Sequence, residues 1–413
     1  MAASDEPPAH PHADPHADPR AHPHANPNPH PARRAGAAAA IAGGAVAATT
    51  MLSSLGAAAY FARKALTPDR QRPDDTHILG VDSTTVTLGV TPDTVVPGRY
   101  GLWLDGERGH ARLGGVVDLD ESAARVRREV LGVDFGHLAP GFGRWNQYYY
   151  ATPPDRSLGL RTEYVDVDTE LGTMPAWVVP AGIPTDRWAI LVHGRGARRH
   201  ECLRAIRPLH DNGINVVVPS YRNDLGARSG PDGRYNLGLS EWRDIEDAGL
   251  HAVQRGARDL ILVGWSMGGA IILQTLARSW LADLVTKVVL DAPVVDWTDV
   301  LTHHAALHGV PGPIGGLARH LMGRRSARRL VGVHDPVDVA RTDWVARAAE
   351  LSHPMLLIHS VDDEFVPVGP SQELARVRPD LVTMEHWDTA RHTKEWNVDP
   401  QRWERSVSDF VSG

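Results

Sequence analysis

The stretch that decides the fold reads LILVGWSMGGAIIL, from Leu260 to Leu273. Its first four residues form a continuous apolar run, which is typical of a strand buried on both faces. The glycines of GWSMG at 264–268 permit a turn in which a Cβ would clash, and the apolar residues after it favour a helix. We therefore predict a strand, a tight turn that presents Ser266, and a helix, which is the setting of a nucleophilic serine.

A nucleophilic serine needs a base to take its proton and a carboxylate to orient that base. The stretch PMLLIH at 354–359 predicts a short buried strand, and SVDDEFVP at 360–367 follows it. A carboxylate just beyond this strand would face the same edge of a parallel sheet as Ser266. Four acids follow candidate strands and compete for this role: Asp362, Asp363, Glu364 and, after the apolar run at 288–290, Asp291.

The base is expected in the loop after the next predicted strand. Residues 381–384 read as that strand, and DTARHT at 388–393 follows it, so we predict that His392 is the base. The chain has 22 histidines, most of which must have other roles. Two histidines at the candidate strands, His359 and His386, are expected to pack in the fold. Three in the segment before these strands could line a pocket: His303, His304 and His308.

A tetrahedral intermediate also needs fixed donors for its negative charge. Losing one such backbone donor costs about 3 kcal/mol in the barrier. Met267, the residue after the serine, would supply one N–H at the start of its helix. A second donor is expected from the loop after an earlier strand, and AILVHGRG at 189–196 fits that position.

Together, these motifs resemble those of the α/β-hydrolases. The nucleophile, acid and histidine follow successive candidate strands in the order of that family. Within this resemblance, the D-x-x-V-P spacing favours Asp363 as the acid, and the H-G-x-G loop implies that Arg195 gives the second oxyanion N–H. The presence of Arg391 before His392 departs from the glycine that relatives often have. The resemblance implies a serine hydrolase with the triad Ser266, His392 and Asp363.

The rest of residues 157–413 fits an α/β-hydrolase domain. Alternating runs at 162–170 and 174–179 predict a hairpin, while 214–219 predicts a parallel strand. Helices are expected to begin near Ser240 and to span about 400–411. We predict a mostly parallel central sheet with helices on both faces. A partly helical cap is expected at about 294–350, where substrate preference would reside.

Three segments of different composition precede residue 157. Residues 1–34 are rich in His, Pro and Ala and predict a disordered tail. Residues 35–62 contain no charged residue, so we predict a single-pass membrane helix, with a cleaved export signal or an Ala-rich soluble helix as alternatives. Its orientation stays open because positively charged residues flank both ends: Arg20, Arg33 and Arg34 before it, and Arg63, Lys64, Arg70 and Arg72 after it. Residues 63–156 predict a linker and a small β-rich subdomain, with a helix at 121–131 and irregular structure from 135 to 154.

Composition narrows the classes of function. A net charge of -7 argues against a nucleic-acid partner. The single cysteine, Cys202, excludes an internal disulfide, and no spacing typical of a metal site or a phosphate loop occurs. We predict a serine hydrolase that cleaves a carboxylic ester, of a lipid or another apolar acyl group, without a cofactor. A peptidase or amidase of the same fold and a non-catalytic membrane-tethered binding protein are the alternatives.

Overall fold

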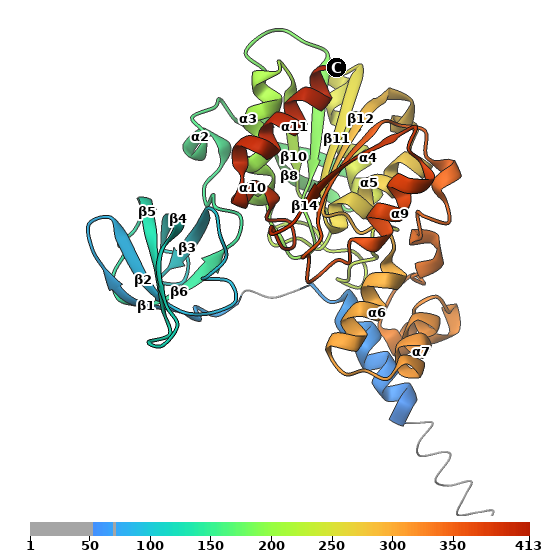
Figure 1. Ribbon diagram of the computed structural model, residues 1–413. Coiled ribbons are helices and arrows are strands. Elements are labelled where there is room, and N and C mark those ends of the chain that lie inside the picture. Colours follow the sequence, from blue (N-terminus) through green and yellow to red (C-terminus); the bar gives the residue numbers. More distant parts are fainter. Residues whose placement is uncertain (1–52, 69–71) are drawn as a thin grey trace, which may run out of the picture. The chain divides into compact units, whose positions relative to one another are not determined.

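The computed structural model describes residues 53–68 and 72–413 (Figure 1). Its centre is an eight-stranded sheet with the order β14-β13-β12-β11-β9-β10-β8-β7. The strands of this sheet are β7 (Glu163–Thr169), β8 (Gly172–Val179), β9 (Arg187–Val192), β10 (Asn215–Pro219), β11 (Asp259–Trp265), β12 (Val285–Asp291), β13 (Met355–Ser360) and β14 (Val382–Trp387). The strands from β9 onward pair in parallel, and β8 pairs antiparallel with both β7 and β10. The carboxyl ends of β11, β13 and β14 therefore lie at one edge of the sheet.

Helices cover both faces of this sheet (Figure 1). Along β11, Leu260 and Leu262 pack on one face, and Ile261 and Val263 pack on the other, as the two-residue period of a strand requires. The first face is covered by α4 (Trp242–Gln254), α5 (Met267–Arg278) and α9 (Gly369–Val377). The second is covered by α3 (Leu203–Asp211), α10 (Glu395–Val398) and α11 (Pro400–Ser412). The predicted mostly parallel sheet with helices on both faces is confirmed.

The segment between β12 and β13 is largely helical. It contains α6 (Trp297–Leu307), α7 (Gly312–Met322), α8 (Arg328–Val331) and the short 3-10 turns η3 (Arg325–Ala327), η4 (Val339–Thr342) and η5 (Ala348–Glu350). Three further short elements lie elsewhere in the chain: α2 (Pro154–Ser157), η1 (Arg199–Cys202) and η2 (Trp280–Leu284).

Six strands before the central sheet close into an antiparallel barrel with the order β1-β2-β5-β4-β3-β6. They are β1 (Thr76–Val81), β2 (Thr85–Gly89), β3 (Tyr100–Leu104), β4 (Gly109–Asp120), β5 (Arg125–Phe135) and β6 (Gly141–Asn146). The predicted β-rich subdomain is therefore present. The helix predicted at 121–131 is wrong, because most of that segment is β5, which pairs with β2 and β4. The stretch from 135 to 154, predicted to be irregular, contains β6.

The predicted membrane helix is also wrong. Within residues 53–68 and 72–413, no helix has the length and apolar character needed to cross a membrane. Residues 53–66 do form a helix, but Ala58, Ala62 and Leu66 are buried in the same apolar core as α4 and α5. Its apolar side therefore packs against protein. Residues 35–52 of the predicted span, and the predicted tail at 1–34, lie outside the described residues.

Candidate active site

Ser266 occupies a tight turn between β11 and α5. Its backbone has φ 52° and ψ -118°, a left-handed region that residues with a Cβ rarely adopt. The glycines beside it allow this turn to pack tightly. A Cβ on Gly268 would lie 2.0 Å from the backbone oxygen of Val192, and one on Gly264 would lie 2.5 Å from Ile272 Cδ1. The turn thus holds the serine at the carboxyl edge of the sheet, with 6% of its surface exposed.

The structure brings Ser266, His392 and Asp363 together. His392 Nε2 lies 3.0 Å from Ser266 Oγ, and its Nδ1 lies 2.7 Å from Asp363 Oδ2. These residues follow β11, β14 and β13, whose parallel pairing sets them side by side. With the Nδ1 proton donated to the carboxylate, Nε2 is left to accept the serine hydroxyl proton.

Among the four candidate acids, Asp363 is the one whose carboxylate contacts the imidazole of His392. Asp362 accepts hydrogen bonds from the hydroxyl of Ser360 and the backbone N–H of Arg391. Asp291 is fully buried and accepts a 2.7 Å hydrogen bond from Trp403 Nε1.

Glu364, the fourth candidate, pairs with the guanidinium of Arg391 at 2.7 Å. Its other oxygen accepts the backbone N–H of His392 at 3.3 Å. Arg391, which departs from the family pattern, is thus part of an ion pair that binds the histidine loop to the acid loop.

The surroundings of Asp363 and His392 set their charges. Burial by itself would raise the pKa of Asp363, but the charge of His392 and hydrogen bonds from His359 and His392 outweigh it and hold the pKa well below its usual range. Burial by itself would lower the pKa of His392, but attraction to Asp363 outweighs it and raises the pKa. His359 is fully buried beneath this pair, with Nε2 3.2 Å from Asp363 Oδ2.

The HGRG loop lies directly against the serine. A Cβ on Gly194 would be 3.2 Å from Ser266 Cβ, and Arg195 follows it along the cavity wall. Met267 is the first residue of α5, so its N–H has no acceptor within the helix. The hydroxyl of Tyr221 holds the loop by donating to the backbone oxygen of Gly194 at 3.0 Å.

A buried ion pair that the sequence analysis missed supports both loops of the site. Glu201, 2% exposed, accepts the backbone N–H of Gly194 at 2.6 Å and lies 3.3 Å from the guanidinium of Arg204. Arg204 is also buried and donates to the backbone oxygen of Thr393 at 2.6 Å, one residue beyond His392. The pair therefore links the HGRG loop to the histidine loop. The sequence feature that could have revealed this pair is the i, i+3 spacing of Glu201 and Arg204, shortly after HGRG.

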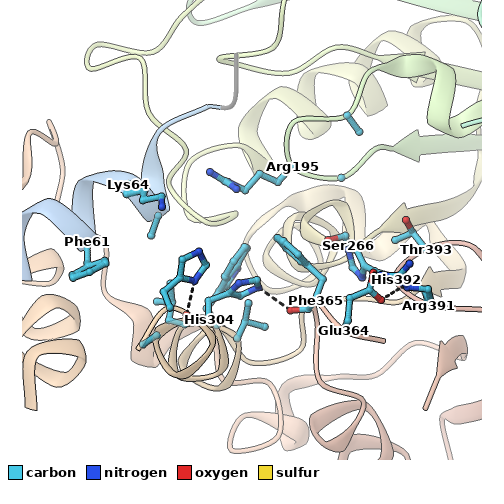
Figure 2. Close-up of a pocket in the computed structure, with 18 of the residues that line it drawn as sticks. Phe61, Lys64, Arg195, Ser266, His304, Glu364, Phe365, Arg391, His392 and Thr393 are labelled. Atoms are coloured by element: carbon cyan, nitrogen blue, oxygen red, sulfur yellow. Dashed lines mark hydrogen bonds and ion pairs between the residues drawn. The ribbon is translucent and has the colours of Figure 1, made fainter. Parts of the chain in front are cut away.

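Ser266 and His392 open into a cavity of about 700 Å³ (Figure 2). His304 and His308 line it, and His303 lies beside it on α6. His304 Nε2 is 2.9 Å from the backbone oxygen of Phe365, and His303 Nε2 is 3.0 Å from that of Glu364. Two histidines of the helical segment thus fix it to the acid loop.

The model of the alpha/beta hydrolase family matches residues 189–410. The chain belongs to this family. Residues 77–146, which form the barrel, match a domain of unknown function (DUF8805). No curated protein matches the chain.

Several solved structures resemble this alpha/beta hydrolase. The esterase Pf2001 of Pyrococcus furiosus is 18% identical, with a TM-score of 0.49 over 63% of this chain and 94% of that one. Est1E of Butyrivibrio proteoclasticus is 14% identical, with a TM-score of 0.44 over 60% of this chain and 97% of that one. The esterase domain of a Rhodothermus marinus protein is 16% identical, with a TM-score of 0.42 over 61% and 98% of the two chains.

The described part of this alpha/beta hydrolase has no group of three or more histidine, cysteine, aspartate or glutamate side chains that could hold a metal ion. Its single cysteine, Cys202, is buried, and burial raises the pKa of the thiol well above its usual value. The thiol is therefore protonated near neutral pH and is a poor nucleophile.

Proposed function

We propose that this protein is a serine hydrolase that cleaves a carboxylic ester with an apolar acyl group. The observation that carries the proposal is the hydrogen-bonded series of Ser266, His392 and Asp363 at the wall of a cavity large enough for a small molecule. Membership of the alpha/beta hydrolase family supports the same reaction class.

In the proposed mechanism, Ser266 Oγ attacks the ester carbonyl as its proton passes to His392 Nε2. The oxyanion accepts hydrogen bonds from the backbone N–H groups of Met267 and Arg195. Collapse of this intermediate breaks the bond to the alcohol oxygen, which takes the proton from His392. Water then attacks the acyl-enzyme, again losing its proton to His392, and the acid leaves as Ser266 Oγ is reprotonated.

Asp363 keeps the imidazole in the useful tautomer and stabilises its charge when it holds the transferred proton. Its low pKa keeps it ionised over the whole neutral range. His392 shares a wall of the cavity with Phe365, whose ring stacks on the imidazole with centroids 5.1 Å apart. This contact excludes water from one face of the base.

An apolar acyl group is favoured by the cavity lining. The wall formed by the helical segment between β12 and β13 is mostly apolar, with His304, His308 and Arg319 as its polar members. Its apolar side chains are Trp297, Val300, Leu301, Ala305, Val310, Ala318 and Met322. Surface of this kind gains free energy by covering hydrocarbon, at about 25 cal/mol for each Å² removed from water.

Labelling with a fluorophosphonate probe tests the nucleophile without knowledge of the substrate. We expect strong labelling of the wild type and none of Ser266→Ala, with His392→Ala reduced to background. Absence of labelling in a folded wild type would contradict the proposal and favour a binding role. Comparing 4-nitrophenyl esters with matched 4-nitroanilides separates an esterase, which we expect, from an amidase.

A further inference from the structure

The helix at 53–66 forms part of the wall of the candidate active site. Four of its side chains line the cavity: Phe61, Ala62, Lys64 and Ala65. This helix precedes both matched segments, 77–146 and 189–410. It is therefore an addition to the hydrolase domain that contributes directly to the place where the substrate would bind.

Hydrogen bonds fix the C-terminal end of this helix. Arg63 Nε donates to the backbone oxygen of Val331, the last residue of α8, at 3.1 Å. The N–H of Tyr235 donates to the oxygen of Leu66 at 2.9 Å. The guanidinium of Arg195, in the HGRG loop, donates to the oxygen of Thr67 at 2.7 Å. With Ala58, Ala62 and Leu66 buried, the helix has one defined position against the cavity.

The cavity has two chemically different sides. The mostly apolar side joins Phe61, Ala62 and Ala65 of this helix to the apolar residues named above from the segment between β12 and β13. Four polar residues of the same elements also line this side: Lys64, His304, His308 and Arg319. The other side is mostly polar and comes from the barrel loops and the histidine loop: Arg72, Pro92, Asp93, Gln147, Tyr148, Arg391, Thr393 and Lys394. Ion pairs order this polar side, since Asp93 lies 3.4 Å from Lys394 and 3.8 Å from Arg391.

The position of His392 decides which side receives which half of an ester. The imidazole must deliver its proton to the leaving alcohol oxygen, so the alcohol leaves beside His392. Arg391, Thr393 and Lys394 flank it there on the polar side. The acyl chain then extends the other way, and Figure 2 shows Phe61 and Lys64 across the cavity from Ser266 and His392.

We propose that the helix at 53–66 is the outer wall of the acyl site and that Phe61 and Ala65 set the length of acyl chain that the enzyme accepts. The substrate class is then an ester of an extended apolar acid with a polar alcohol. This inference rests on the proposed esterase function. In this proposal, the small side chain of Ala65 leaves room for the acyl chain, and Phe61, which lies across the cavity from Ser266 in Figure 2, closes the acyl site.

The test compares the relative kcat/KM for 4-nitrophenyl esters from acetate to palmitate. Ala65→Trp fills the proposed channel, so kcat/KM for long esters should fall by at least about tenfold while that for acetate stays within about twofold, since one methylene in such a pocket already changes kcat/KM by about tenfold or more. Phe61→Ala should move the preferred chain length upward. Gly56→Ala on the same helix is the control, because nothing lies within 4 Å of its added Cβ and Gly56 does not line the cavity.

The outcomes separate this inference from the esterase function itself. If the wild type and the variants all hydrolyse acetate esters and share one chain-length preference, the role of the helix is overturned and the esterase proposal stands. If Ala65→Trp fails to fold, the upward shift in Phe61→Ala decides, and an unchanged profile there overturns the inference. A wild type that hydrolyses no ester would remove both proposals.

Discussion

At the scale of single residues, three consecutive acids with similar intrinsic chemistry are given different environments. Asp363 is buried between two imidazoles and accepts the N–H groups of Phe365 and Val366 at 2.8 Å each. Asp362 and Glu364 instead accept backbone N–H groups of the histidine loop and do not contact the imidazole of His392. The sequence narrowed the candidates for the acid to these three residues and Asp291, and the D-x-x-V-P spacing of the family favoured Asp363. The residues alone could not decide, because the choice depends on which side chain the turn after β13 directs inward.

The pH dependence of activity follows from the raised pKa of His392. The base must be neutral to accept a proton, so kcat/KM should fall as pH drops through a midpoint above the ordinary histidine value of about 6.5. Asp363→Asn removes the main cause that raises this pKa, while burial, which lowers it, remains. We expect kcat to fall by about 10⁴-fold in this variant. Histidine NMR should show the His392 titration moving to lower pH, and an unmoved titration would contradict the assigned pairing.

At the scale of elements, the contact between β9 and α5 determines the shape of the serine turn. A Cβ on Gly268 would lie 2.0 Å from the backbone oxygen of Val192, which no rotamer change can relieve. Gly268→Ala should therefore destabilise the protein by about 3 kcal/mol or more and abolish probe labelling. Denaturant unfolding followed by circular dichroism measures this. Gly316→Ala on α7 is the control, because nothing lies within 4 Å of its added Cβ, and it should be neutral or slightly stabilising.

Local patterns predicted the elements of the sheet better than those of the barrel. The strands and turns of the site were predictable because each parallel strand is a short apolar run that ends in a chemically distinctive loop. In β5, Val126 and Val130 are four residues apart, which also suits a helical face. Closure of the barrel decides otherwise, since Val126 pairs with Leu88 of β2 and Leu119 of β4. Such non-local pairing has no signature within the segment itself.

At the scale of the whole molecule, the segment before the barrel was misread because hydrophobicity does not reveal what covers an apolar helix. The alanines at 58 and 62 and the leucine at 66 suit both a lipid environment and a protein core. The order of serine, acid and histidine, by contrast, was predictable, because the topology of a parallel sheet fixes which loops meet. The cavity could not be predicted, since its walls come from many segments far apart in the sequence, from the helix at 53–66 to the histidine loop.

The central claim is that Ser266 forms an acyl-enzyme, and rapid acid quenching with intact-mass analysis tests it most directly. The wild type is mixed with a 4-nitrophenyl ester and stopped early in turnover. We predict a mass increase equal to one acyl group, located by peptide mapping on Ser266 and missing from Ser266→Ala. Hydrolysis that continues in Ser266→Ala, or an acyl group found on another residue, would contradict the account.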